Sequence, residues 1–282
     1  MPEVTRFAPS PTGWLHLGHA YAAWFAQEAA GAGGRFLLRI EDLDLGRVRP
    51  EYEAAIHEDL AWLGLAWERP VLRQSEHLAF YRAALDRLIG QGLCYPCFCS
   101  RSAIQVELQR LAQAPHGPDG PLYPGTCRRH STAERQERIA AGEPHAWRLD
   151  VALAARQSGP LAWTDLEAGS FAAEPGRFGD VLLSRKEIDA VAYHLSVVLD
   201  DARQGITLVT RGLDLLPASH LHRLLQALLD LPVPRWHHHR LVRDETGRRL
   251  AKRSDALALR TLRERGLSPE AVQRLARAEA AV

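Results

Sequence analysis

A turn rich in proline and glycine near the N-terminus separates a short apolar segment from a long helix-favouring one. Residues 5–8 are typical of the end of a strand, and residues 16–32 are rich in alanine and finish at glycines, which is typical of a helix. Pro9, Pro11 and Gly13 keep the connecting residues out of regular structure. A helix beginning there would direct free backbone N–H groups and the positive end of its dipole towards the turn. The junction therefore predicts a site for an anion such as phosphate.

The following segments continue this alternation of strand and helix. Residues 35–40 are typical of a buried strand, and residues 50–63 and 76–88 have helical periodicity. This order predicts an α/β protein with a parallel sheet.

The alternation breaks and then resumes. Residues 97–130 hold three cysteines and several prolines and glycines, and residues 131–185 combine a short polar helix with short strands. Helix, strand and helix follow again in residues 190–199, 206–210 and 217–229. We therefore expect a nucleotide-binding sheet interrupted by an insertion, with a short helical segment from about residue 256.

Composition excludes several classes of protein. The 282 residues are 46% hydrophobic and 24% charged, which is typical of a globular protein. No run of about 18 uncharged apolar residues predicts a membrane span, and no signal-peptide pattern is present, so we expect a cytoplasmic protein. The net charge of +1 means that RNA contacts must come from local patches. Residues 128–130 and 248–253 are candidates, although ordinary solvated arginines are an equal alternative.

Two histidines and a glycine stand at the expected start of the first helix. His16 and His19 would share one helix face, and Gly18 would let a ligand approach the backbone closely. Imidazole N–H groups can donate hydrogen bonds to phosphate oxygens as charge builds up in a transition state. Structural roles or a metal site are alternatives for the two rings, but no third metal ligand follows nearby.

Lysine is rare in this chain, which uses arginine for almost all of its positive charge. Lys186 and Lys252 are its only lysines, and Lys252 stands in a basic loop preceded by a glycine. A compact ammonium differs chemically from a planar guanidinium. Lys252 is therefore a candidate for a specific cationic role, although its occurrence can also be accidental.

The cysteines suggest a metal site. Thiols in a reducing compartment favour metal binding over disulfides, and structural zinc takes four ligands. By count, the chain supplies four with Cys94, Cys97, Cys99 and Cys127. The first two also match a redox C-x-x-C pattern, but no thioredoxin-like context surrounds them. The consecutive histidines at residues 237–239 are expected in a loop, and we expect no second metal site there.

Four blocks in a fixed order resemble those of the class I aminoacyl-tRNA synthetases for glutamate and glutamine. The blocks are residues 6–19 (with residues 16–19 as the HIGH element), residues 40–44, residues 211–216, and residues 249–253 as the KMSKS loop. In the last block Ala251 replaces the serine and Arg249 replaces the first lysine, whereas Lys252 keeps the lysine that holds ATP phosphates in the family.

The resemblance implies a Rossmann-like parallel nucleotide-binding sheet, a zinc-containing insertion, a short helical C-terminal segment and no anticodon-binding domain. The implied segments are residues 1–96 (first half of the catalytic domain), 97–185 (zinc-containing, acceptor-binding-like insertion), 186–232 (second half) and 233–282 (KMSKS-like loop and helical segment).

It also implies the site residues. Glutamate would lie against Arg6, Phe7, Ala8, Pro9 and Ser10, with Arg211 on its carboxylate, Glu41 on its α-amino group and Tyr193 closing the pocket. ATP, with Mg2+, would be held by His16, Gly18, His19 and Lys252, of which the histidines and the lysine are the catalytic candidates.

Each of these assignments has a structural alternative. Arg211 could be a surface arginine, Glu41 could pair with Arg39, and Tyr193 could belong to the core. Residues 184–189 depart from the Arg-Arg-Asp-Gly-like run that the family has before the tyrosine.

For zinc, the resemblance favours Cys97, Cys99, Tyr123 and Cys127, with Cys94 in the core. A tyrosine ligand is feasible because the charge of the ion favours the phenolate.

The whole length of the chain resembles one short family within this group, the glutamyl-Q tRNA(Asp) synthetases. That resemblance implies activation of glutamate without tRNA, followed by transfer to queuosine in the anticodon loop of tRNA(Asp). A monomer is our default expectation, since the sequence carries no sign of an oligomeric state. Three alternatives stay open: a minimal synthetase that charges the tRNA 3′ end, a non-catalytic tRNA-binding paralogue, for which Ala251 is the best argument, and a ligase acting on a small molecule.

Overall fold

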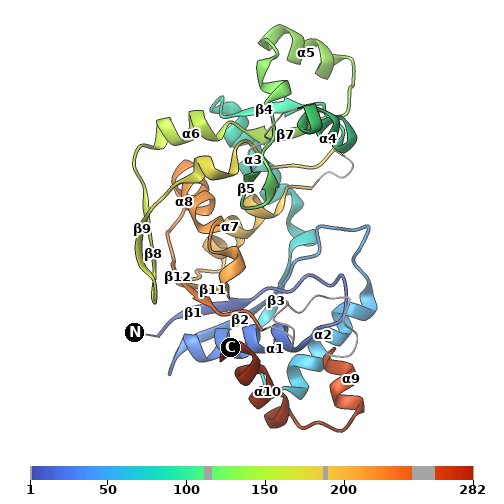
Figure 1. Ribbon diagram of the computed structural model, residues 1–282, viewed down its shortest axis with the longest axis vertical. Coiled ribbons are helices and arrows are strands. Elements are labelled where there is room, and N and C mark those ends of the chain that lie inside the picture. The colour runs from blue at the N-terminus through green and yellow to red at the C-terminus, as the bar shows by residue number, and fades with distance from the viewer. Residues whose placement is uncertain (1, 111–115, 187–189, 243–257, 282) are drawn as a thin grey trace.

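The computed structural model describes residues 2–110, 116–186, 190–242 and 258–281 (Figure 1). The longer helices are α1 (Leu17–Ala30), α2 (Pro50–Trp62), α3 (Leu78–Gly90), α4 (Arg101–Arg110), α5 (Thr132–Ala140), α6 (Val151–Ser158), α7 (Tyr193–Arg203), α8 (Ala218–Leu228), α9 (Leu259–Glu264) and α10 (Pro269–Ala281). The strands are β1 (Val4–Phe7), β2 (Arg35–Ile40), β3 (Glu68–Arg73), β4 (Cys94–Cys97), β5 (His116–Gly117), β6 (Gly120–Pro121), β7 (Ala146–Leu149), β8 (Ala162–Asp165), β9 (Gly169–Ala172), β10 (Val181–Leu182), β11 (Leu208–Gly212) and β12 (Arg235–His239).

A mostly parallel sheet forms the centre of the molecule. Strands β1, β2 and β3 pair in parallel, as do β11, β12 and β8, and β9 adds an antiparallel edge. The two groups meet where β1 lies beside β11, and there the Thr207 N–H donates to the Val4 carbonyl at 3.0 Å. The parallel α/β architecture expected from the sequence is therefore confirmed.

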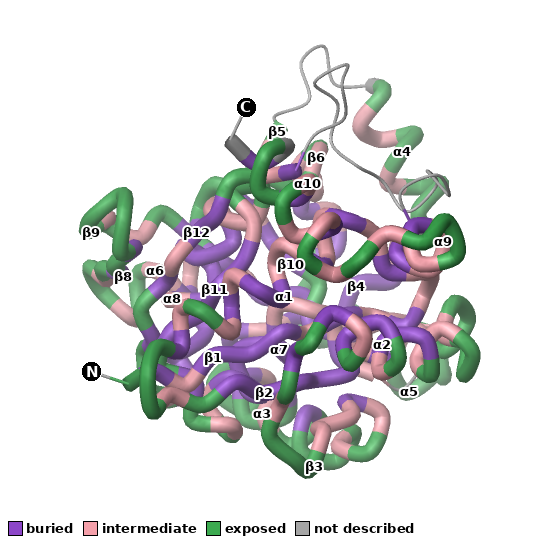
Figure 2. The backbone as a smooth tube through the Cα atoms, turned by 90° about the horizontal axis from the view of Figure 1, so that it is seen from below, coloured by how far each residue is buried: buried purple, intermediate pink, exposed green. Residues whose placement is uncertain are grey.

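Helices cover both faces of this sheet (Figure 1). On one face α1 packs against β1 and β11, and its buried alanines, among them Ala20, Ala23 and Ala26, let the helix approach the strands closely. On the other face α7 and α8 pack together with α3 and α6 around a second apolar core. Figure 2 shows that β1, β2 and β11 are buried between these layers.

A smaller antiparallel sheet, in the order β10-β7-β4, lies at the far end of the molecule beside α4 and α5 (Figure 1). Strand β4 crosses the expected boundary between residues 96 and 97, and β8 and β9 belong to the central sheet although they lie between residues 97 and 185. The division of the chain into the four segments expected from the sequence stays a prediction.

Most elements expected from the sequence are present within one to four residues of the expected ends. Two differences stand out. Strand β3 was not expected, and residues 237–239 form part of β12 rather than a loop, because parallel pairing aligns His237 and His238 with Thr210 and Arg211 of β11. Three consecutive histidines give no local signal for a strand, and their strand conformation depends on pairing with the neighbouring strand.

Helices α9 and α10 confirm the expected helical C-terminal segment. Helix α10 packs against α1, where Arg277 also pairs with Glu28. Among the described residues, every helix is too short or too polar to cross a membrane.

Candidate active site

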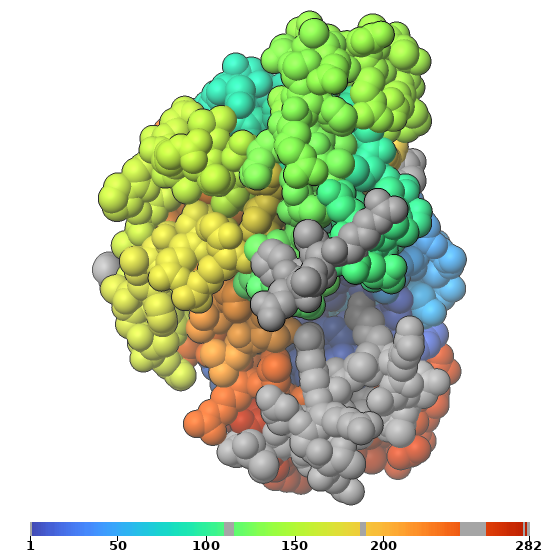
Figure 3. Space-filling view, turned by 45° about the horizontal axis from the view of Figure 1, so that its top comes forward, coloured from blue at the N-terminus to red at the C-terminus, as the bar shows by residue number. Residues whose placement is uncertain are grey.

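A cleft of about 750 Å³ opens at the carboxyl ends of β1, β2, β11 and β12. Open parallel sheets bind their ligands at this edge. Figure 3 shows the hollow on this face, with N-terminal residues at its floor. The residues expected to bind glutamate and ATP that line it are Arg6, Phe7, Ala8, Ser10, His16, Gly18, His19, Glu41, Tyr193 and Arg211.

Two expected residues are not among those that line the cleft. Pro9 is buried, and its carbonyl accepts a hydrogen bond from the Glu41 N–H at 3.1 Å, so it ties the turn after β1 to the end of β2. Lys252 and the rest of the KMSKS-like block lie outside the described residues, as do residues 187–189 before Tyr193.

The start of α1 is fixed by its two histidines. His16 is the N-cap residue, and its Nδ1 accepts a hydrogen bond from the Gly18 N–H at 3.1 Å. The His16 N–H in turn donates to Nδ1 of His19 at 3.1 Å, and the two ring centres lie 3.9 Å apart. Because both Nδ1 atoms accept, each neutral ring carries its proton on Nε2. This reciprocal cap stabilises the helix terminus and fixes both imidazoles as Nε2–H donors.

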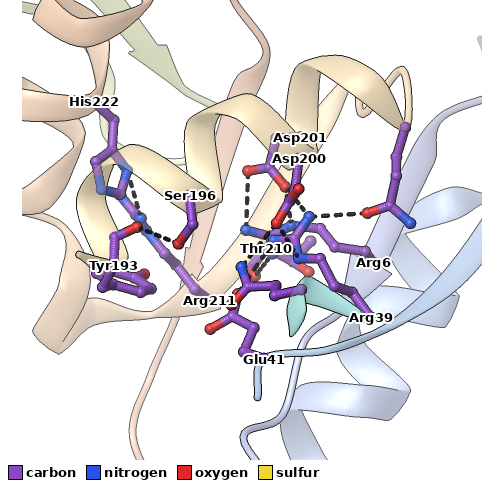
Figure 4. A network of polar contacts seen from close by, with 12 residues as sticks. Arg6, Arg39, Glu41, Tyr193, Ser196, Asp200, Asp201, Thr210, Arg211 and His222 are labelled. Atoms are coloured by element: carbon purple, nitrogen blue, oxygen red, sulfur yellow. Dashed lines mark hydrogen bonds and ion pairs between the residues drawn. The ribbon is translucent and has the colours of Figure 1, made fainter. Parts of the chain in front are cut away.

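Beside the cleft, one carboxylate joins two buried arginines (Figure 4). Asp201 of α7 accepts from Nε and Nη2 of Arg6 at 2.9 and 3.2 Å, and from Nη1 of Arg39 at 2.8 Å. Arg6 also donates to the Thr210 carbonyl at 3.0 Å. Burial alone would raise the pKa of Asp201, but the two guanidinium groups outweigh burial and lower it. The network thus joins β1, β2, β11 and α7 at the floor of the cleft.

Glu41 lies at the end of β2, where it meets both the cleft and this network. Its carboxylate is 3.4 Å from Nη2 of Arg39. Glu41 therefore pairs with Arg39, as the alternative proposed, and also lines the cleft. Burial raises the pKa of Glu41, although Arg39 and Arg6 oppose that rise. A bound ammonium group would stabilise the charged form of this carboxylate.

Arg211, at the end of β11, is a buried cation with neutral partners (Figure 4). It donates from Nη2 to Ser219 Oγ at 2.6 Å, from Nε to His238 Nε2 at 3.1 Å and from Nη1 to His222 Nδ1 at 3.1 Å. In the described part of the chain it makes no ion pair, and burial lowers its pKa. A buried guanidinium without a carboxylate is costly unless a ligand supplies one, so Arg211 is suited to bind an anion.

Tyr193, the first residue of α7, lies beside His222 with ring centres 5.9 Å apart and lines the cleft. It also packs against the core around α7 and α8. Tyr193 is therefore both a core residue, as the alternative proposed, and a residue of the cleft. Burial raises its pKa, so the hydroxyl stays protonated.

Sequence reasoning missed several residues of the site. They are Arg39, Asp201, Ser219, His222 and His238. A usable signal existed for Arg39, which stands among the apolar residues of a buried strand segment, because such a charge requires a partner.

A separate cluster of thiols lies beside the small antiparallel sheet, at the end of β4. The sulfur atoms of Cys97, Cys99 and Cys127 lie within 4.8 Å of one another. The Tyr123 hydroxyl is 3.6 Å from the first and 3.4 Å from the second, and the Cys99 and Cys127 sulfurs are 3.5 Å apart. Ligands at about 2.0–2.3 Å around a tetrahedral zinc ion are roughly 3.3–3.8 Å apart. These four groups therefore fit a zinc ion, whereas Cys94 packs against the apolar core instead.

Two exposed arginines that follow Cys127 are paired with carboxylates. Arg128 lies 3.0 Å from Asp180, and Arg129 lies 3.3 Å from Glu107. Residues 128–130, considered as an RNA-binding patch, therefore offer less unpaired charge than their sequence suggests. The other candidate patch, residues 248–253, lies outside the described residues.

Removing the Asp201 charge is expected to destabilise the fold. Asp201→Asn leaves two buried guanidinium groups short of a partner and should lower the free energy of unfolding by about 3–5 kcal/mol in urea titrations. Asp86→Asn, which breaks an exposed pair with Arg82, is the control and should cost less than about 1 kcal/mol. Equal effects would show that the network contributes little.

Asp201→Asn also tests the lowered pKa of the Asp201 carboxyl group. An aspartate titrates near about 3.9 in the unfolded chain, and the folded value for Asp201 is lower. Its stabilisation is therefore complete above the unfolded pKa and is lost as the pH falls through the folded one. The stability of Asp201→Asn should accordingly depend less on pH below about 4.

Comparisons with known proteins agree with this geometry. Residues 3–278 match the family described as tRNA synthetases class I (E and Q), catalytic domain. A relative from Rhodobacter capsulatus, named glutamyl-Q tRNA(Asp) synthetase, is 50% identical, with 96% of this chain and 99% of that protein covered. The glutamate–tRNA ligase of Aquifex aeolicus is 39% identical, with 95% of this chain but 55% of that protein covered.

Solved structures agree as well. The glutamate–tRNA synthetase of Elizabethkingia anophelis superposes with a TM-score of 0.73 at 25% identity, covering 95% of this chain and 54% of that one. The family match spans both strand groups and the sheet edge that bears the cleft. The chain therefore belongs to the class I tRNA synthetase (E and Q) catalytic-domain family, whose members are ligases.

Proposed function

We propose that the protein activates L-glutamate with ATP and transfers it to the queuosine base in the anticodon loop of tRNA(Asp). The observation that carries the first step is Arg211, a buried cation with neutral partners at the edge of the cleft. The acceptor is supported by the relatives from Rhodobacter capsulatus and Symbiobacterium thermophilum, which bear that name and of which the chain covers 99% and 83%.

In this proposal the cleft holds glutamate by its two charged ends. The Arg211 guanidinium binds the side-chain carboxylate, and Glu41 accepts hydrogen bonds from the α-ammonium group. Tyr193 closes the pocket, and residues 6–10 form its wall. Arg6 is already paired with Asp201, so it contributes to the wall and to the local potential. The free α-carboxylate is then left for reaction.

ATP lies over the start of α1, with Mg2+ on its phosphates. The glutamate α-carboxylate attacks the α-phosphorus, the bond to the bridging oxygen breaks, and pyrophosphate leaves as glutamyl adenylate forms. His16 and His19 donate Nε2–H hydrogen bonds to phosphate oxygens, the helix terminus adds its positive potential, and Lys252 supplies a cation. Positioning and charge stabilisation suffice, and no covalent enzyme intermediate is needed.

The thiol cluster is proposed as a structural zinc site held by Cys97, Cys99, Tyr123 and Cys127. The Phe98 N–H donates to the Cys127 sulfur at 3.3 Å, and Arg148 donates to the Cys97 sulfur at 3.3 Å. Such donors stabilise the thiolates that zinc requires. The ion would order the insertion of residues 97–185, which we propose as the acceptor-binding segment of a monomer. RNA recognition there would depend on loop shape and base stacking.

Gly18→Ala tests the phosphate end of the cleft. A Cβ at this position would lie 3.1–3.2 Å from the His16 ring and would displace it. We expect glutamate-dependent ATP–pyrophosphate exchange to fall on the order of 100-fold. Gly90→Ala in α3 is the matched control, because nothing lies within 4 Å of its Cβ. It should leave the exchange rate unchanged, and equal rates in the two variants would contradict the assignment.

Cys127→Ser tests the zinc site. The purified variant should lose most of the bound zinc measured by mass spectrometry, because one of four ligands is removed. Cys94→Ser changes a thiol outside the cluster and should retain zinc at the level of the unmodified protein. Loss of zinc in both variants, or in neither, would contradict the proposed ligand set.

Transfer of labelled glutamate tests the acceptor. The protein, ATP and Mg2+ are incubated with total tRNA from cells that make queuosine and from cells that cannot. Label only on queuosine-containing tRNA is the expected result. Equal labelling of both would indicate charging of the tRNA 3′ end instead. Absence of label from both would favour a non-catalytic protein or a ligase for a small molecule.

A further inference from the structure

Two buried histidines hold the Arg211 guanidinium from opposite elements. His222 lies on α8 and His238 lies on β12. We propose that both are positioning residues, which orient Arg211 for a substrate carboxylate while leaving its positive charge uncancelled. This inference rests on the proposed function, because it assumes that Arg211 binds the carboxylate of glutamate.

His238 is fixed by a second buried carboxylate. Its Nε2 accepts from Arg211, so Nδ1 carries the proton and donates to Asp165 Oδ2 at 2.7 Å. The His238 N–H donates to the same oxygen at 3.1 Å, and two backbone N–H groups of the turn after β8 hold the other oxygen. The imidazole therefore cannot rotate without losing these hydrogen bonds.

His222 is fixed by a chain of hydrogen bonds that leads to the surface. Its Nδ1 accepts from Arg211, so Nε2 carries the proton and donates to Nδ1 of His194 at 3.1 Å. Nε2 of His194 then donates to Asp119 at 3.2 Å, beside strand β6 of the insertion. Each ring fixes the tautomer of the next.

Neutral acceptors matter here because a carboxylate would compete with the substrate. Arg6, only one strand away, shows the contrast, since Asp201 neutralises it. Burial lowers the pKa of His238 to about 4 and that of His222 well below its usual range, and Arg211 adds to both effects. Both rings are therefore uncharged acceptors at neutral pH, and Arg211 keeps its positive charge for a ligand.

The donor count of the guanidinium fits this role. Of its five N–H groups, one on Nε and one on each terminal nitrogen are taken by His238, His222 and Ser219. One N–H on each terminal nitrogen is left by these three partners at the cleft, where the Tyr193 side chain also hydrogen-bonds to the guanidinium. Two parallel N–H groups are the arrangement that binds a carboxylate bidentately.

Paired variants of His222 test the proposal through the KM for glutamate in ATP–pyrophosphate exchange. His222→Leu removes the acceptor and should raise this KM about ten-fold or more, with the KM for ATP unchanged. His222→Asn places an amide oxygen near the former Nδ1 and should recover most of the loss. At the second ring, His238→Gln should likewise have a lower KM for glutamate than His238→Leu, because the longer amide places an acceptor at the Nε2 position.

His220→Leu is the matched control. His220 is a buried histidine of the same helix whose Nδ1 accepts from Trp163 and from the Glu174 N–H rather than from Arg211. This variant should lose stability but keep the KM for glutamate. An increase in KM that is equal in His220→Leu and His222→Leu, or no difference between His222→Asn and His222→Leu, would overturn the positioning role.

The unmodified protein separates the two possible failures. If it shows glutamate-dependent exchange and His222→Leu and His238→Leu keep its KM for glutamate, only the positioning role is wrong. If it shows no such exchange, the proposed function fails and the positioning role fails with it. Should His222→Leu not fold, the comparison of His238→Leu with His238→Gln decides, because only the variant without an acceptor should raise the KM for glutamate.

Discussion

The position of Asp201 between Arg6 and Arg39 is the contact on which the cleft depends. The three groups come from α7, β1 and β2, which are far apart in the sequence and meet only where the two strand groups join. Each arginine would be costly in the interior without a partner. The carboxylate therefore fixes how the helix sits on both strands, and with it the floor on which Glu41 and the turn after β1 lie.

The buried arginines of the site have two different kinds of partner. Arg6 and Arg39 are neutralised by carboxylates, so their role is to hold elements together and to set the local potential. Arg211 is held by a hydroxyl and two imidazoles, none of which cancels its charge. A folded protein can maintain such a cation only where solvent or a ligand supplies the missing anion. The partners of an arginine in this site thus indicate whether its charge holds elements together or is available to bind a ligand.

The sequence predicted the parts of the site that depend on local signals. The turn and the two histidines of α1 follow from proline, glycine and imidazole at fixed spacing, and the structure adds the reciprocal cap between His16 and His19. What the sequence did not predict depends on contacts between distant elements. Asp201 looks like an ordinary helix residue until β1 is placed beside it. His238 looks like a loop residue until β11 pairs with it, and only then can it meet Arg211.

The hydrogen bonds behind Arg211 also connect two parts of the molecule. From the cleft they pass through His222 and His194 to Asp119, which lies in the insertion that carries the thiol cluster. Because Arg211 can only donate, it makes Nδ1 of His222 an acceptor, and this tautomer in turn makes His194 the donor to Asp119. The hydrogen bonds that hold Arg211 and those that reach the segment around Asp119 therefore form one continuous series in this fold.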